Sequence, residues 1–285
     1  MNKIERIVVT VLLSATVLLS VTGCGGKQPV VETAPPETET ATALPVTQVP
    51  SGVQTMLLMS LADYQITDKV KTLRNDQQVD FIMLMTIDSD ANTTTAIQID
   101  PDIEVPFQHQ GAAKAETMPL GEIYTYGSGG SDSNLNILMA VSKLMDNVKI
   151  DYYMTFDADS VSIMTDMLGG VTVNITDSFP EAYPELAKGG SVCLDGKNAD
   201  IFFNYVAPED SDNTSHMRRQ QEFIKGVYGP FSSNAGQEEF VTQLSMKLGE
   251  KMNTDLTLSQ MLKMMETLQE YKLDDSIQML KKGET

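Results

Sequence analysis

The stretch Lys149–Ile175, which reads KIDYYMTFDADSVSIMTDMLGGVTVNI, constrains the fold of this chain more than any other segment. It predicts a strand over Ile150–Phe156, a helix over Asp159–Leu168 and a second strand over Val171–Ile175. An acidic residue opens the predicted helix, and Gly169-Gly170 closes it, as glycine commonly does at helix C-termini. Strand, helix and strand in close succession favour a layered α/β fold.

Further strands are predicted upstream of this stretch. Two apolar runs and one Thr-rich alternating run have the patterns of buried and hairpin strands: Thr55–Ala62, Val79–Thr86 and Thr93–Ile99. The sequence SDAN at Ser89–Asn92 supplies the turn between the last two runs. The segment Val105–Thr117 has no periodicity, and we interpret it as a loop.

Four more helices are predicted from amphipathic patterns and capping residues: Asn134–Asp146, Met217–Tyr228, Glu238–Met252 and Leu256–Tyr271. We expect Asp132 or Ser133 to cap the first of them, and Thr254 or Asp255 to cap the last. The apolar run Ala199–Val206 fits either a helix or a strand.

The first 24 residues have the pattern of a secretory signal. Lys3 and Arg6 precede the apolar run Ile7–Val21, which is short for a membrane-spanning helix because such a helix needs roughly 20 apolar residues. Small residues stand directly before Cys24, as in a bacterial lipobox. We therefore interpret residues 1–23 as a lipoprotein signal peptide and expect Cys24 to carry lipid. An uncleaved anchor helix is the alternative.

Composition after Cys24 indicates a tether followed by one domain. Residues 24–52 are rich in Pro, Thr, Val and Glu, and such a composition cannot bury enough apolar surface to fold. Residues 53–285 suit one larger domain. The formal net charge of −19 is repelled by nucleic-acid phosphates and by anionic lipid head groups, so DNA binding is not expected.

Four blocks occur in an order that resembles the LytR-CpsA-Psr family of cell-envelope proteins. The first two are strand-like, LLMSLAD at Leu57–Asp63 and VDFIMLMTID at Val79–Asp88. The third is YTYGSGG, followed by a helix and IDYYMTFD. The fourth joins MLGGVTVNI and LDGKNA to RRQQ at Arg218–Gln221. The resemblance covers about Met56–Tyr228 and implies a layered α/β/α sandwich with a mixed central sheet.

This resemblance also implies an activity, namely the transfer of glycopolymers from polyprenyl-pyrophosphate carriers to peptidoglycan. In the family two aspartates hold Mg²⁺ on the pyrophosphate, and Asp63 and Asp80 fall at the matching positions. Mg²⁺ prefers one or two carboxylates together with phosphate oxygens and water, so the residue types agree. We place both aspartates at strand ends, where their side chains can converge at one edge of the sheet.

Most arginines of the family motifs are absent. The family block S-I-P-R-D aligns with Ala96–Asp100, where Ile99 replaces the arginine and Asp100 is kept. The block Y-V-R-x-R aligns with Tyr205–Glu209, where both arginines are missing. Guanidinium groups grip phosphates through two parallel hydrogen bonds, so these losses weaken a pyrophosphate site.

The block D-x-x-R-x-x-R-Q aligns with Asn213, His216, Arg219 and Gln220. By the resemblance, Arg219 contacts the pyrophosphate, and Asp100 and Gln220 orient the reacting groups. Arg218 and a protonated His216 are additional candidates for substrate binding. We expect the polyprenyl tail to lie in an apolar cleft lined from Ile82–Met85, Ile163–Leu168 and Ile201–Phe203.

Two functions remain open. The first is a lipoprotein on the outer face of the cytoplasmic membrane with reduced or lost transferase activity. The second is a non-catalytic module on the same fold that binds a lipid or an envelope partner. The secretion signal and the acidic charge argue against a transcriptional regulator. Gly127–Gly130 could cradle an anion at a helix N-terminus, although an ordinary loop is the simpler interpretation. His109, in a polar loop, receives no role.

Overall fold

The structure is a computed structural model that describes residues 52–64, 74–235, 237–273 and 276–284. The predicted signal peptide, Cys24 and all of the tether before Gly52 lie outside these residues. Within the described ranges, none of the helices combines the length and the apolar character that crossing a bilayer requires.

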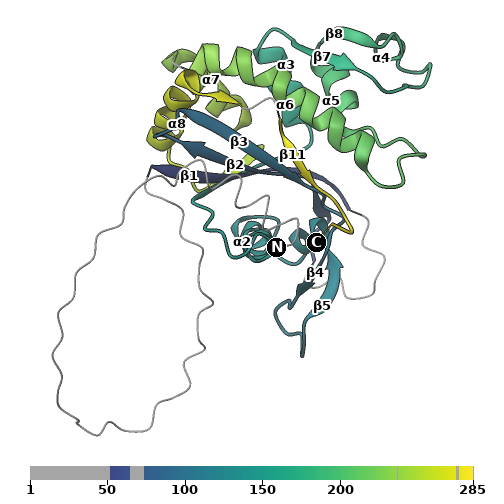
Figure 1. Cartoon of the computed structure of the whole chain (residues 1–285), viewed down its shortest axis with the longest axis vertical. Coiled ribbons are helices and arrows are strands. Elements are labelled where there is room, and N and C mark those ends of the chain that lie inside the picture. The colour runs from purple at the N-terminus through teal and green to yellow at the C-terminus, as the bar shows by residue number, and fades with distance from the viewer. Residues whose placement is uncertain (1–51, 65–73, 236, 274–275, 285) are drawn as a thin grey trace, which may run out of the picture.

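A seven-stranded mixed sheet forms the centre of the molecule (Figure 1), in the order β10-β3-β2-β1-β6-β9, with β11 also paired to β3. The strands are β1 Val53–Asp63, β2 Gln77–Asp88, β3 Thr93–Ile99, β6 Tyr152–Phe156, β9 Met252–Thr254, β10 Lys272–Leu273 and β11 Gln278–Leu280. Strand β2 runs antiparallel to both of its neighbours, β1 and β3, whereas β6 runs parallel to β1. The predicted layered α/β fold with a mixed sheet is therefore confirmed.

One face of the sheet is covered by the helix α2, Ser131–Leu144, and the 3₁₀ helix η2, Gly121–Thr125. A small hairpin of β4, Glu104–Phe107, and β5, Glu116–Pro119, lies on the same side (Figure 1). Alternate residues of β1 such as Leu57 and Met59 point into this core, where they meet Ile137 and Val141 of α2.

The opposite face is covered by five helices: α3 Ser160–Met167, α5 Gly196–Asn204, α6 Thr214–Ala235, α7 Glu238–Leu248 and α8 Leu258–Glu270. The intervening residues of β1 and β2, such as Met56 and Met83, pack against Phe202 and Phe223 in this second core. A two-stranded hairpin of β7, Val171–Ile175, and β8, Gly190–Leu194, lies beside α6, with the short helix α4, Pro184–Ala187, between its strands.

Several local predictions need correction. The segment Val105–Thr117, interpreted as a loop, contains most of the β4–β5 hairpin. Helix α2 has Gly130 at its N-cap, and Thr257 caps α8 in a capping box with Gln260. Thr254 is not available as a cap because it belongs to β9, where it pairs with β6. The ambiguous run Ala199–Val206 is mostly the helix α5.

Candidate functional site

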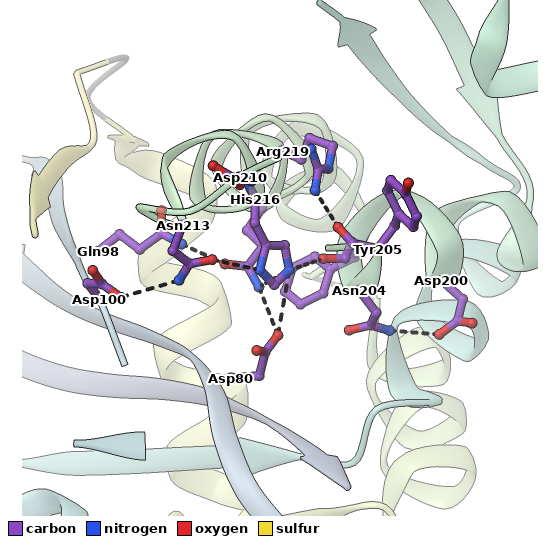
Figure 2. Close-up of polar contacts among 12 residues, drawn as sticks. Asp80, Gln98, Asp100, Asp200, Asn204, Tyr205, Asp210, Asn213, His216 and Arg219 are labelled. Atoms are coloured by element: carbon purple, nitrogen blue, oxygen red, sulfur yellow. Dashed lines mark hydrogen bonds and ion pairs between the residues drawn. The ribbon is translucent and has the colours of Figure 1, made fainter. Parts of the chain in front are cut away.

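Asp80 lies at a bulge in β2. Ser60 of β1 pairs with Phe81, and Leu61 pairs with Val79, so Asp80 is the extra residue between the two pairs. A bulge interrupts the pairing and redirects a side chain. The carboxylate points toward α6 (Figure 2) and is 22% exposed. Asp80 therefore lies inside β2 and not at the strand end where it was expected.

Helix α6 presents two polar side chains to this carboxylate. His216 and Gln220 are four residues apart, which places them on one face of the helix. The Nε2 atom of His216 lies 3.6 Å from Asp80 Oδ2, and Gln220 Nε2 donates to the same oxygen at 3.4 Å. Burial raises the pKa of Asp80, while the charge of His216 and the hydrogen bond from Gln220 oppose that rise.

The neighbours of the His216 ring define which protons it can carry. Asn213 donates to Asp100, so its side-chain oxygen faces His216 Nδ1 at 3.1 Å, and Nδ1 is therefore a donor. At Nε2, the carbonyl oxygen of Phe203 lies at 2.9 Å and Gln220 Nε2 lies at 3.1 Å. A charged ring donates to Phe203, whereas a neutral ring accepts from Gln220.

Asp100 is buried and joins three parts of the chain through hydrogen bonds. Its Oδ1 accepts hydrogen bonds from Asp102 N at 3.0 Å and Asn213 Nδ2 at 3.2 Å. Its Oδ2 accepts from Lys282 N at 3.2 Å, which ties the end of β3 to the C-terminal segment. Asp100 reaches His216 only through Asn213, so its place suits a positioning role.

Arg219 is buried and points away from Asp80. Its Nη1 donates to Asp177 Oδ2 at 2.5 Å. Its Nη2 donates to the carbonyl oxygen of Tyr205, as Figure 2 shows. The guanidinium also lies over the rings of Phe179 and Tyr205, at 5.5 and 5.8 Å from the ring centres. Because Asp177 already balances its charge, Arg219 is poorly placed to bind a further anion. Arg218, the next residue along, is exposed.

The N-terminus of α6 is occupied by carboxylates of the chain itself. Asp210 accepts hydrogen bonds from the backbone N–H groups of Ser215 at 3.1 Å and His216 at 2.7 Å. Asp212 accepts from Thr214, and this hydrogen bond is the main reason that its pKa is lowered to about 2. Helix N-termini attract phosphates through these same N–H groups. Here the acidic loop takes the place that a phosphate would need.

The segment that precedes α2 is held by side chains from the first turn of that helix. The N–H of Ser128 donates to the carboxylate of Asp132 at 2.9 Å, and the N–H of Gly129 donates to Ser133 Oγ at 3.1 Å. These bonds satisfy the glycine-rich segment Gly127–Gly130 internally. The simpler interpretation of this segment, a loop–helix junction without an anion, agrees with its geometry.

A metal site of protein ligands alone is not formed in the described part of the chain, where no group of three or more His, Cys, Asp or Glu side chains could hold an ion. Asp63, the exposed last residue of β1, pairs across the sheet with Gln77, near the bulge that carries Asp80. Mg²⁺ sites often combine one or two protein carboxylates with substrate phosphates and water. The residue types of Asp63 and Asp80 fit Mg²⁺ when a phosphate-bearing ligand supplies the remaining oxygens.

An apolar cavity of about 160 Å³ lies between the sheet and helices α6, α7 and α8. Its lining includes eight methionines: Met56, Met85, Met154, Met164, Met252, Met261, Met264 and Met265. Met85 and Met164 come from the segments predicted to line an apolar cleft. Ile201–Phe203 do not reach the cavity, because Phe202 stacks on Phe179 in the second core.

Sequence reasoning did not single out Asp177, although this residue decides what Arg219 can do. The available signal was its position two residues after the strand Val171–Ile175, at a strand end where polar side chains often serve a site. Asp177 and Arg219 are 42 residues apart in the chain, so the sequence alone does not indicate that they pair.

Comparison with known proteins identifies the family of this chain. The model of the LytR_cpsA_psr family matches residues 31–282, and the chain belongs to that family. A curated relative is the polyisoprenyl-teichoic acid–peptidoglycan teichoic acid transferase TagU of Bacillus subtilis, 25% identical over 151 residues. The match covers 53% of this chain and 45% of TagU, so it spans less than half of that relative.

Solved structures share the fold at low sequence identity. TagV of B. subtilis is similar with a TM-score of 0.62 and 20% identity, covering 81% of this chain and 84% of TagV. Protein gbs0355 of Streptococcus agalactiae gives a TM-score of 0.64 at 17% identity, covering 80% and 77% of the two chains. TagT bound to LI-WTA gives 0.58 at 15% identity, covering 81% and 78%.

Proposed function

We propose that this protein binds a polyprenyl-pyrophosphate-linked glycopolymer at the outer face of the cytoplasmic membrane, anchored through Cys24, and has lost most of the family's transfer activity. The observation that carries the proposal is the state of Arg219. This arginine is the one that matches the family motif, and its buried guanidinium is neutralised by the half-buried Asp177.

The apolar cavity is the proposed place for the polyprenyl tail. Methionine side chains are flexible and polarisable, so they adapt to ligands of irregular shape. At about 160 Å³ the cavity holds only a short segment of a tail, and typical ligand pockets enclose roughly 300–1,000 Å³. Binding a longer segment therefore requires α7 and α8 to move away from the sheet.

The head group is held weakly in this proposal. A hydrogen bond to a charged group contributes about 1.5–3 kcal/mol, and the three arginine positions at Ile99, Ala207 and Glu209 contribute none. Ile99 is fully buried, so it cannot contact a ligand. Asp210 and Asp212 add negative charge where a pyrophosphate would approach α6.

Mg²⁺ remains part of the proposal, held by Asp80 and Asp63 together with phosphate oxygens of the ligand. The ion would neutralise part of the pyrophosphate charge. His216 and Gln220 orient the Asp80 carboxylate for that role. Because burial raises the pKa of Asp80, its anionic form is less favoured than that of an exposed aspartate.

A slow transferase is the second candidate, and the pair of Asp80 and His216 favours it. A neutral imidazole or a carboxylate can take the proton from an acceptor hydroxyl as general base. This candidate needs no arginine for proton transfer, but it still lacks the arginines that would stabilise the polyprenyl phosphate that leaves when the acceptor hydroxyl attacks phosphorus and the pyrophosphate bond breaks.

An assay of glycopolymer transfer from a polyprenyl-pyrophosphate carrier to peptidoglycan separates the two candidates. We expect the carrier to bind and the transfer rate to stay at background with Mg²⁺ present, in the wild type and in Asp80→Ala alike. The matched control is Asp90→Ala, in the exposed turn after β2. Mg²⁺-dependent transfer that Asp80→Ala abolishes and Asp90→Ala spares would contradict the proposal and favour the slow transferase.

A further inference from the structure

A second cavity, of about 400 Å³, lies on the α2 side of the molecule and has a different chemistry. It is formed where the β4–β5 hairpin meets η2 and the first turns of α2. Three aromatic rings and several amide or carboxylate side chains line it, among them Phe107, Gln108, His109, Tyr126, Asp132 and Asn136. The apolar cavity shares none of these residues.

The aromatic side of this cavity is a small stack of rings. His109 and Tyr126 lie parallel, with centres 4.8 Å apart and planes at 15°. Phe107 leans on Tyr126 at 5.6 Å and 53°. On Tyr126, the guanidinium of Arg74 lies 4.6 Å from the ring centre. The three rings hold one another in place and line one side of the cavity.

The polar side supplies hydrogen-bond acceptors and donors. The carboxylate of Asp132 is held by Ser128 N at 2.9 Å and Ser128 Oγ at 2.6 Å, and the bond from Ser128 keeps the pKa of Asp132 below its usual value. Asn136 Nδ2 donates to the carbonyl oxygen of Tyr126, which turns its amide oxygen away from that bond. The side chain of Gln108 is exposed at the rim.

The charge at the cavity disfavours an anionic ligand. Arg74 is the positive group, but Glu122 Oε2 lies 3.6 Å from its Nη2 and shares the charge. Asp132 stays ionised and repels phosphates and carboxylates. The cavity therefore suits an uncharged molecule with one apolar face and several hydroxyl groups, because the hydroxyls can donate to Asp132 and the amides while the apolar face covers the rings.

We propose that this cavity binds an uncharged pyranose unit of a saccharide. The volume lies within the range of roughly 300–1,000 Å³ that is usual for small-molecule sites. The sugar could belong to the carrier-linked glycopolymer or to the glycan strand of the wall, and this choice between sources rests on the proposed function. Saccharide binding itself does not require the lipid cavity or the Asp80 site.

Saturation-transfer NMR with lipid-free saccharides tests the proposal on residues 24–285, which comprise the tether and the domain. The probes are an oligomer of N-acetylglucosamine, soluble glycan-strand fragments of peptidoglycan, and a carrier glycopolymer released from its lipid. We expect at least one probe to bind the wild type. A charge-assisted or stacking contact contributes enough that His109→Ala and Asp132→Asn should each weaken binding about tenfold.

The matched control is Met139→Ala, which changes an exposed α2 side chain that does not line the cavity, and its binding should equal that of the wild type. Thermal melting confirms that each variant is folded, and Asn136→Ala replaces any variant that is not. Absence of binding for every probe, or binding that the cavity variants leave unchanged, would overturn the proposal. Because the probes lack lipid and pyrophosphate, that failure would leave the proposed lipid binding untouched. Preference for wall fragments over the released glycopolymer would identify the wall as the source.

Discussion

At the scale of single residues, Asp80 combines partial burial with a raised pKa. When the folded-state pKa lies above the unfolded value of 3.8, ionised Asp80 lowers the stability of the fold at every pH above the folded pKa. That cost fades as the pH falls through the folded pKa and disappears below about 3.8, where both states are protonated.

Asp80→Asn should therefore raise the free energy of unfolding at pH 7 by about 0.5–2 kcal/mol, because a neutral amide replaces a partly buried carboxylate. The gain should shrink toward zero as the pH approaches 3.8. Urea denaturation at several pH values measures it, with Asp90→Asn as the control. A loss of stability at pH 7 would mean that attraction to His216 outweighs the cost of burial.

The pair of Arg219 and Asp177 gives a second prediction at this scale. Asp177→Asn removes the charge that balances a buried guanidinium. Breaking a buried pair costs roughly 3–5 kcal/mol, and the 23% exposure of Asp177 reduces our expectation to about 1–3 kcal/mol. The freed guanidinium should also bind polyprenyl pyrophosphate about tenfold more tightly.

The control for this prediction is Asp159→Asn, whose pair with Lys251 is exposed and should contribute at most about 1 kcal/mol. Denaturation and lipid titration of both variants provide the measurements. Unchanged lipid affinity in Asp177→Asn, despite a correctly folded protein, would show that Arg219 is not part of the head-group site.

The residue types of the site were largely visible in the sequence, whereas their contacts were not. Asp80, His216 and Gln220 were named as site residues, and the structure brings them together. Asp63 and Arg219 were named too, but Arg219 turns to Asp177. A sequence motif gives the position of a side chain along its helix. The partner that competes for that side chain comes from a distant strand end, and only the fold reveals it.

At the scale of secondary-structure elements, helix α6 carries both His216, which faces Asp80, and Arg219, which faces Asp177. Substitutions at two glycines of this helix can test how it packs. A Cβ on Gly226 would lie 2.5 Å from the backbone oxygen of Thr172 in β7, so α6 needs glycine there. A Cβ on Gly229 would meet nothing within 4 Å.

Gly226→Ala should destabilise the protein by about 1–3 kcal/mol through overpacking against β7. Gly229→Ala should change the stability by less than about 1 kcal/mol, because the higher helix propensity of alanine is opposed by Pro230, which disfavours a helical conformation for a preceding residue that carries a Cβ. Urea denaturation of the two variants provides the comparison on one helix. Equal effects would contradict the close approach of α6 to β7.

Among the elements, those with their own apolar pattern were predicted correctly from the sequence. The predicted strand Val171–Ile175 is β7 without a change of bounds, and Thr93–Ile99 is β3. The short elements β4, β5, β9, β10 and β11 were missed. Strands of two to four residues carry too few apolar positions for a pattern, so their pairing depends on the partner strand that tertiary structure supplies.

At the scale of the whole molecule, the sheet separates two sites of different chemistry. Helices α6, α7 and α8 lie on one side of the sheet and α2 lies on the other (Figure 1). The first side has the Met-lined cavity and the acidic loop before α6, and the second has the aromatic and polar cavity. The chain as a whole is also acidic, with a formal net charge of −19. The arrangement suits a protein that recognises a lipid tail and a sugar better than the charged link between them.

The most direct test of this account compares two ligands that share a tail and differ in the head group. The dissociation constants of polyprenyl pyrophosphate and of the corresponding polyprenol should be measured in detergent micelles with Mg²⁺ present. We predict that both bind and that their affinities differ by at most about tenfold, or about 1.4 kcal/mol. A preference of about 1,000-fold for the pyrophosphate would contradict the account, because it would require the strong head-group site that Asp177, Asp210 and the missing arginines should prevent.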